Sequence, residues 1–340
     1  MHKEPERIPL RSARMVREGS STAESARPSA AAVRLKRVEA VVNIAAGSVG
    51  RGAGDALREI MHSFGLTAEV AEARPSEIEQ ALARARAADP DLMVVLAGDG
   101  TARLAAEMCG PDGPLLAPLP GGTMNMLPKA LYGSHDWREA LALALERGEE
   151  RMISGGEVNG RAFYVAAILG APALWADARE AVRAMKLWRA ILRARRACER
   201  AFTGELQFAL DGADPRRAEA LTLMCPLVSR AGRGQQALEA DALDPHGVAE
   251  AFRLGLRAAF GGFLGDWRAD PSVTLARAQA GQAWAGGRIP AILDGEPHRF
   301  PRQVSFSFRP SAFRALAPRL EPPPEPPEAV ISDSVKTALE

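Results

Sequence analysis

The sequence is poor in cysteine and lysine, and each shortage excludes a class of protein. Its 340 residues include only three cysteines, Cys109, Cys198 and Cys225, which lie far apart in the chain. This excludes a small disulfide-stapled scaffold and gives no metal-ligand spacing, so we expect reduced thiols in the cytoplasm. Lysine occurs five times, and Lys plus Arg (43) barely exceeds Asp plus Glu (42). Without an excess of basic charge, nucleic acid is not an expected partner.

Long apolar runs are also missing. One of the longest uncharged stretches, 162–176, has 15 residues and contains Gly170 and Pro172, whereas about 20 apolar residues are needed to cross a bilayer. The N-terminus mixes Lys3 with Glu4, and no apolar segment follows, which argues against a secretory signal. We therefore expect a cytoplasmic protein without a membrane span. Most of the 162–176 run is predicted to be core strand, although it could also line a cleft for acyl chains.

Composition divides the chain into four parts. Residues 1–34 carry seven basic and four acidic side chains among Ser, Ala and Pro, which predicts a flexible arm. Residues 319–340 begin with a proline-rich run that cannot supply the hydrogen bonds of a helix or sheet, which predicts a disordered tail. The folded body is predicted to comprise two domains, 35–150 and 151–318.

The first domain is predicted to be α/β. Short apolar runs alternate with helical patterns, as expected of a doubly wound parallel sheet whose strands are joined by crossover helices. Ligands bind such a sheet at the carboxyl ends of its strands. The expected strands are 38–44, 67–71, 92–97 and 115–119, and the expected helices are 52–64, 76–88, 101–109, 123–132 and 136–147.

The second domain is predicted to be a β-rich, sandwich-like domain. Asn159-Gly160 lies between two strand-like runs, and this pair is the strongest short hairpin signal. The active site is expected in the cleft between the two domains. The expected strands are 151–158, 162–169, 205–210, 220–228, 273–276, 289–293 and 304–308.

Three loops rich in small residues follow strands of the predicted parallel sheet. They contain the segments NIAAGSVG, LAGDGT and LPGGTMN. Glycines let the backbone approach a ligand closely, and the N–H groups of a following helix favour an anion such as phosphate. Thr123 and Asn125 could add side-chain hydrogen bonds, and Asp99 would need a divalent cation or an ordered donor beside phosphate. The GxxxxGK[ST] pattern is absent, which excludes a P-loop ATPase. A Gly-Asp-Gly turn can also simply close a strand-to-helix connection.

A fourth segment completes a family resemblance. VVNIAAGS, LAGDGT, LPGGTMNML and LDGEP, in this order, resemble the diacylglycerol kinase catalytic family, which includes bacterial lipid kinases, sphingosine kinases and ceramide kinases. The resemblance covers about residues 36–310. It implies ATP and Mg²⁺ as cofactors. The implied nucleotide contacts are Asn43, Gly47, Ser48, Gly98, Asp99, Gly100, Thr101, Gly121, Gly122, Thr123 and Asn125.

The resemblance also implies catalytic carboxylates. The late Asp-Gly-Glu supplies the base in this family, so Asp294 and Glu296 are candidates together with Asp99. Asp244 lies in a segment that resembles an acidic loop holding a structural Mg²⁺. Without the family, Asp294-Gly295 is simply a hairpin turn and Glu296 a solvated side chain. Arg103 stands where many relatives have Asn.

Residues 177–200 are predicted to form a basic amphipathic helix. They carry eight basic and three acidic side chains, with the apolar residues on one side at helical spacing. Such a helix can bind an anionic membrane surface, which predicts peripheral association with the cytoplasmic face. The alternative is an ordinary surface helix packed on the β-rich domain.

These observations predict an ATP-dependent lipid kinase. It would transfer the γ-phosphate to the primary hydroxyl of a membrane lipid, either diacylglycerol or a ceramide or other sphingoid lipid. A soluble nucleotide kinase of the NAD-kinase type is one alternative, which predicts a water-soluble acceptor and no dependence on vesicles. A catalytically silent lipid or nucleotide sensor is another, and it predicts ATP binding without phosphate transfer.

Overall fold

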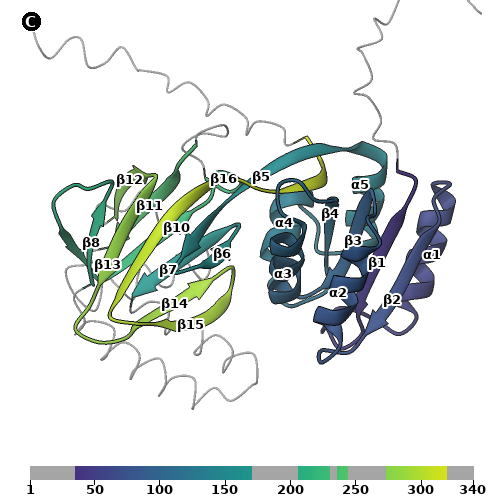
Figure 1. Cartoon of the computed structure of the whole chain (residues 1–340), viewed down its shortest axis with the longest axis horizontal. Helices are drawn as coiled ribbons and strands as arrows, with labels where there is room; N and C mark the ends of the chain where they lie inside the picture. Colours follow the sequence, from purple (N-terminus) through teal and green to yellow (C-terminus); the bar gives the residue numbers. More distant parts are fainter. Residues whose placement is uncertain (1–34, 171–205, 230–235, 244–272, 320–340) are drawn as a thin grey trace, which may run out of the picture. The chain divides into compact units, whose positions relative to one another are not determined.

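The computed structural model describes residues 35–170, 206–229, 236–243 and 273–319 (Figure 1). The predicted basic helix 177–200 and the candidate metal ligand Asp244 lie outside these ranges, as does the predicted arm. In the described part of the chain, no helix combines the length and the apolar character that a membrane span requires.

The N-terminal part contains four parallel strands in the order β2-β1-β3-β4, with helices in the crossover connections (Figure 1). Every residue of β3 and β4 is buried, as expected of central strands covered on both faces. The doubly wound α/β prediction is confirmed. The elements are β1 (Val38–Asn43), α1 (Ala53–Ser63), β2 (Ala68–Ala73), α2 (Ile78–Ala87), β3 (Leu92–Ala97), α3 (Asp99–Cys109), β4 (Leu115–Pro120), α4 (Met126–Tyr132) and α5 (Trp137–Arg147).

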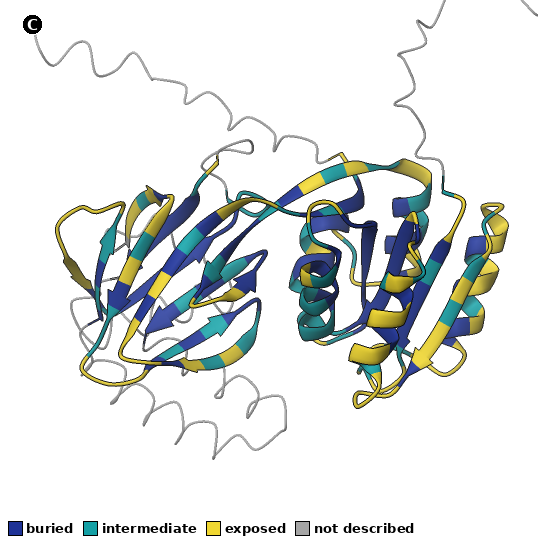
Figure 2. Cartoon of the chain, in the orientation of Figure 1, coloured by how far each residue is buried: buried dark blue, intermediate teal, exposed yellow. Residues whose placement is uncertain are grey.

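The remaining strands form two antiparallel layers that share one core. Phe163, Phe208 and Phe306 from one sheet are buried together with Leu169, Leu223 and other apolar side chains of the second. The sandwich-like prediction is confirmed, and Figure 2 shows the buried residues concentrated along these strands. The first layer belongs to a ten-stranded sheet that also includes β1–β4. It consists of β5 (Gly148–Val158), β6 (Arg161–Phe163), β8 (Leu206–Leu210), β9 (Arg216–Ala218), β13 (Ala280–Trp284) and β16 (Gln303–Pro318). The second contains β7 (Ala166–Gly170), β10 (Ala220–Met224), β11 (Leu238–Leu243), β12 (Val273–Ala278), β14 (Ile289–Leu293) and β15 (Glu296–Phe300).

Strands β5 and β16 form a long antiparallel ribbon. It contributes buried side chains to the core of the N-terminal part and to the core between the two antiparallel layers. Its register shifts between Arg309 and Phe313, and beyond this bulge β16 pairs parallel to β4 at Ala315. The strand expected at 304–308 therefore continues to Pro318. Pro310 cannot donate to a ladder, and it lies in the bulge, where pairing is interrupted anyway.

Two further expectations differ from the structure for local reasons. The run 162–169 is two strands, because Tyr164 and Val165 turn their backbone N–H groups to a side chain instead of a ladder. Helix α4 begins at Met126, and Asn125 before it has a left-handed backbone (φ 50°). The hairpin at Asn159-Gly160 is confirmed, with φ values of 47° and 79°.

Candidate active site

The three small-residue loops are tied to one another at the carboxyl edge of the parallel sheet. Ser48, in the loop after β1, donates its backbone N–H to the carbonyl oxygen of Gly121 (2.9 Å) and its hydroxyl to that of Gly122 (2.8 Å). Gly121 donates its own N–H to the carbonyl oxygen of Ala97, at the end of β3 (2.9 Å). The loops therefore form one connected platform.

Two glycines of this platform are required by contact between the loops themselves. A β-carbon on Gly122 would lie 2.7 Å from the Cα of Gly98, and one on Gly121 would lie 2.8 Å from the backbone nitrogen of Ala97. Neither backbone neighbour can swing away as a side chain could. The sequence indicated close approach to a ligand, and the structure adds close approach of one loop to another.

Asn125 closes the loop after β4. Its side-chain oxygen accepts the N–H of Gly122 (2.7 Å), and its amide donates to the carbonyl oxygen of the same residue (3.0 Å). The side chain is almost fully buried. In this structure the side chain therefore shapes the loop, and its contact with nucleotide stays a prediction. Thr123 is exposed, whereas Asn43 uses its side-chain oxygen to accept the N–H of Ala45 (3.1 Å).

Asp99 caps α4, the helix that follows the neighbouring loop. Its two carboxylate oxygens accept the backbone N–H groups of Asn125 (2.8 Å) and Met126 (2.6 Å), at the beginning of α4. Burial raises the pKa of Asp99 above its ordinary value, and the negative charge of Glu296 acts in the same direction against these two hydrogen bonds. Asp99 thus joins the two glycine loops, with its carboxylate held by backbone donors.

The first turn of α3 is the open helix end of the platform. Its N-cap residue, Gly98, has no side chain and so provides no side-chain cap for the first N–H groups. Gly100 and Thr101 lie in that first turn and are partly exposed. An uncapped helix start at the carboxyl edge of a parallel sheet fits a phosphate group.

Asp294 is a buried anchor. Its carboxylate accepts three backbone N–H groups, from Tyr164 (2.7 Å), Val165 (2.9 Å) and Ala166 (3.0 Å). Burial raises its pKa to about 6, although these hydrogen bonds oppose the shift. Asp294 and Gly295 both have positive φ, 46° and 87°, as a tight β14–β15 hairpin requires.

The raised pKa of Asp294 predicts a pH-dependent stability. The native pKa is about two units above the ordinary value of 3.8, and each unit corresponds to about 1.4 kcal/mol. Because the native state holds this proton more tightly, the stabilisation is fully present below pH 3.8 and is lost as pH rises through 6. We expect the free energy of unfolding of the wild type, minus that of Asp294→Asn, to fall by about 2 kcal/mol between pH 4 and 7. Urea unfolding across this range measures it, and a difference that stays flat or rises would contradict the assignment.

The same hairpin brings Glu296 to α3. A β-carbon on Gly100 would lie 2.1 Å from Oε1 of Glu296, so the carboxylate lies directly over the first turn of the helix. Gly295 in turn approaches the loop after β4, where a β-carbon would lie 3.3 Å from the sulfur of Met126. Within the described ranges, the Glu296 carboxylate accepts no hydrogen bond, and the side chain is 40% exposed. Of the three predicted catalytic carboxylates, it is the one not bound to backbone donors.

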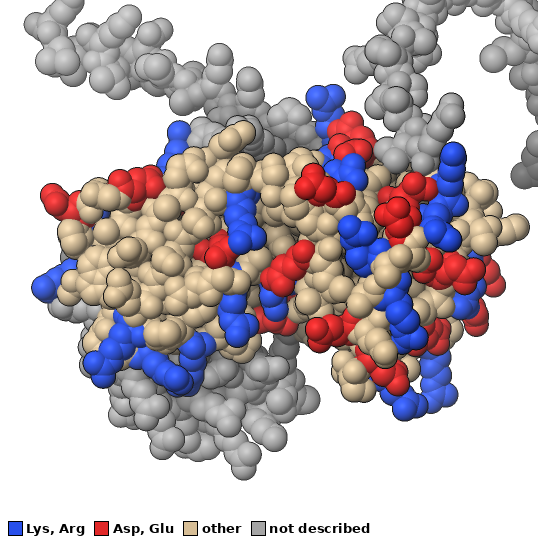
Figure 3. All heavy atoms as spheres, viewed as in Figure 1, with Lys and Arg blue, Asp and Glu red and all other residues tan. Residues whose placement is uncertain are grey.

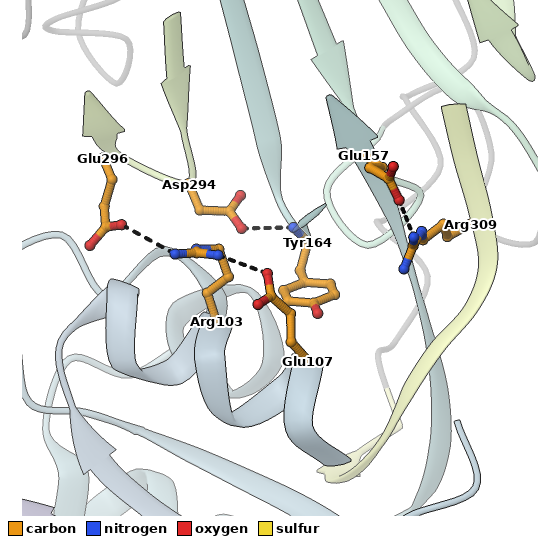
Figure 4. A network of polar contacts seen from close by, with 7 residues as sticks. All are labelled: Arg103, Glu107, Glu157, Tyr164, Asp294, Glu296 and Arg309. Atoms are coloured by element: carbon orange, nitrogen blue, oxygen red, sulfur yellow. Dashed lines mark hydrogen bonds and ion pairs between the residues drawn. The ribbon is translucent and has the colours of Figure 1, made fainter. Parts of the chain in front are cut away.

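Three further side chains lie around Glu296, and of these only Glu107 was not singled out from the sequence. Arg103 donates to Glu107 one turn along α3 (2.7 Å), and its Nη2 lies 3.9 Å from Glu296 (Figure 4). His298, two residues after Glu296, shares its face of β15. The i,i+4 spacing of Arg103 and Glu107 was a visible signal of their pairing, whereas only the fold places them beside the hairpin.

Comparison with known proteins identifies the N-terminal part of this chain. Residues 37–158 match the family model of the diacylglycerol kinase catalytic domain. These residues belong to the diacylglycerol kinase catalytic family. This match supports a kinase. The matched range holds all three loops and ends with β5, so Asp294 and Glu296 are contributed from outside it.

Solved structures extend the likeness to the C-terminal part. The chain is similar to a diacylglycerol kinase from Bacillus anthracis, with a TM-score of 0.61 at 15% identity, covering 84% of this chain and 97% of the other. A second structure from the same organism gives 0.62 at 18% identity, covering 84% and 98%. At such identities the likeness establishes the fold of the diacylglycerol kinase structure. Yeast NADH kinase is more distant, with a TM-score of 0.46 at 12% identity.

Proposed function

We propose that this protein is an ATP-dependent lipid kinase that transfers the γ-phosphate to the primary hydroxyl of a membrane lipid. The family supports a kinase, and one observation carries the mechanism. The Glu296 carboxylate, without a hydrogen bond among the described residues, faces the uncapped first turn of α3 at Gly100. A base and a phosphate-binding helix end therefore lie side by side, which is the arrangement that phosphoryl transfer to an alcohol requires.

The residues of the platform fit a nucleotide triphosphate. Backbone N–H groups of Gly100 and Thr101 would bind phosphate oxygens, and the exposed Thr123 hydroxyl would add a donor. Bound Mg²⁺ would neutralise charge on the phosphates. Asp99, at the start of α3, holds the start of α4 by accepting two backbone hydrogen bonds from it. Glu296 accepts the proton of the attacking hydroxyl, and Asp294 fixes the hairpin that presents Glu296.

The lipid acceptor is the part of the proposal that goes beyond the family match. Diacylglycerol and ceramide each present a primary hydroxyl above two chains, and both are candidates. Peripheral association with an anionic membrane through the basic segment 177–200 would bring the site to its substrate. Figure 3 shows basic and acidic side chains interspersed over the N-terminal part on the face it displays, without a broad basic surface there to replace that segment.

Radiolabelled ATP tests the proposal directly. The protein is incubated with γ-labelled ATP and Mg²⁺ and with vesicles containing diacylglycerol, ceramide or neither, and a parallel sample contains NAD without vesicles. We expect label in one lipid, with a rate that depends on the amount of vesicle surface. Label in NAD without vesicles would instead identify a soluble nucleotide kinase, and ATP binding without any transfer would identify a silent sensor.

A further inference from the structure

Two of the three guanidinium nitrogens of Arg103, beside Glu296, make no hydrogen bond among the described residues. Its Nη1 donates to Glu107 (2.7 Å), but Nε is buried and has no hydrogen-bond partner within the described ranges. The remaining nitrogen, Nη2, lies 3.9 Å from Glu296, which is beyond hydrogen-bond distance. Nε and Nη2 form the edge of a guanidinium that binds carboxylate or phosphate with two parallel hydrogen bonds. Figure 4 shows this group lying between Glu107 and Glu296.

A second unsatisfied nitrogen lies on the same side of the hairpin. Nε2 of His298 is buried and also lacks a hydrogen-bond partner in the described part of the chain. Burial lowers the pKa of His298, and the positive charges of Arg161 and Arg103 act in the same direction. The imidazole is therefore neutral at pH 7, and in the tautomer with its hydrogen on Nε2 it can donate one hydrogen bond from that atom. Leaving a buried donor unpaired costs about 1–3 kcal/mol, so an acceptor for these groups is expected when the site is in use.

The side chains around Glu296 are acidic, so an oxyanion that binds here as the acceptor needs a cation beside it. The negative charge of Asp99 contributes to raising the pKa of Asp294, and that of Glu296 contributes to raising the pKa of Asp99. A phosphate group entering this acidic region is repelled unless positive charge accompanies it. Arg103 carries that charge, and Glu107 occupies only one of its nitrogens.

We infer that the free edge of Arg103, with His298 as a second donor, binds a phosphate oxyanion next to Glu296. The inference rests on the proposed function and adds a specificity-determining site to it. Two phosphates could occupy the site: the phosphoryl group in transfer, or a phosphate in the headgroup of the acceptor lipid. In the first case Arg103 stabilises charge during transfer, and in the second it selects anionic acceptors.

Three variants separate this role from a structural one. Arg103→Met removes the donors at similar volume, and Arg103→Lys keeps the charge without the fork. Arg299→Met is the matched control, because Arg299 is exposed on the opposite face of β15. We expect Arg103→Met to lower activity about 100-fold, Arg103→Lys to recover only part of it, and Arg299→Met to match the wild type.

Comparing a neutral with an anionic lipid acceptor distinguishes the phosphoryl group in transfer from a headgroup phosphate. If Arg103→Met lowers kcat with neutral diacylglycerol while KM values stay within about threefold, the site binds the phosphoryl group in transfer. If the loss is confined to an acceptor such as phosphatidylglycerol, the site binds the headgroup phosphate. Unchanged activity of Arg103→Met with both acceptors would overturn the inference.

A binding measurement keeps the inference separate from the lipid kinase proposal. The imidazole nitrogen signals of His298 are followed by NMR while inorganic phosphate is added to the full-length protein. We expect them to shift in the wild type and in Arg299→Met, and to stay unchanged in Arg103→Met. If the signals behave in this way but no lipid is phosphorylated, the lipid acceptor is rejected and the oxyanion site is retained. If the titrations are identical in all three proteins, the oxyanion site is rejected.

Discussion

Replacing Glu296 by Gln is expected to lower kcat by about 10²–10⁴-fold, the usual contribution of a general base. The change removes one negative charge and the ability to accept a proton, and it keeps the size of the side chain. Folding should be unaffected, because the carboxylate is 40% exposed and accepts no hydrogen bond from described residues. Initial rates with labelled ATP and the preferred lipid, together with a thermal melt, measure both effects.

Glu79 provides the matched control for this substitution. It lies in the first turn of α2, it is exposed, and Glu79→Gln makes the same chemical change away from the three loops. Wild-type kcat is expected for this variant. A Glu296→Gln enzyme that retained kcat within a few-fold of the wild type would assign the base to another residue.

The second large effect is expected from Gly100→Ala. The new β-carbon would lie 2.1 Å from Oε1 and 2.9 Å from Cδ of Glu296, so the carboxylate must leave its position over α3. A displacement of about 1 Å at a reacting group can cost about 100-fold in rate. Stability should hold or improve, because alanine favours a helix over glycine by about 1 kcal/mol and the displaced side chain is free to move. Lost activity with an unchanged or higher melting temperature is the expected combination.

Gly54→Ala makes the same substitution in α1, also against a glutamate. Its β-carbon would lie 2.3 Å from Oε1 of Glu72, which is exposed on β2 and can move into solvent. Activity is expected to stay at the wild-type level. Equal losses of activity in Gly54→Ala and Gly100→Ala would show that the effect does not depend on Glu296.

The architecture and the loops were predictable from local patterns, whereas the roles of individual polar side chains were not. Alternating apolar runs and helical periods gave the order of elements, and Asn159-Gly160 gave a correct hairpin. Asp99, Asn125 and Asp294 were all identified as site candidates from their motifs. Asn125 bonds to the backbone of its own loop, whereas the carboxylates of Asp99 and Asp294 bond to backbone groups of other segments. No sequence pattern specifies which N–H a carboxylate will reach across 26 or 128 residues.

Arg103 illustrates the remaining gap. Its pairing with Glu107 follows from helix spacing, but its approach to Glu296 depends on a hairpin 193 residues further along the chain. Short strands such as β13, with the sequence AGQAW, were missed because alanine and glycine give little strand signal. They are held by their neighbours on both sides, β8 and β16.

The ribbon of β5 and β16 determines where this polypeptide can be cut. Phe313, Ala315 and Leu316 of β16 are buried in the N-terminal core, and the hydroxyl of Tyr132 donates to the carbonyl oxygen of Leu316 (3.0 Å). A fragment ending at residue 158 would retain the family-matched sequence but expose the edge of β4 and leave β5 without its long partner. An uncovered edge of this kind promotes aggregation, so recombinant versions should extend through Pro318.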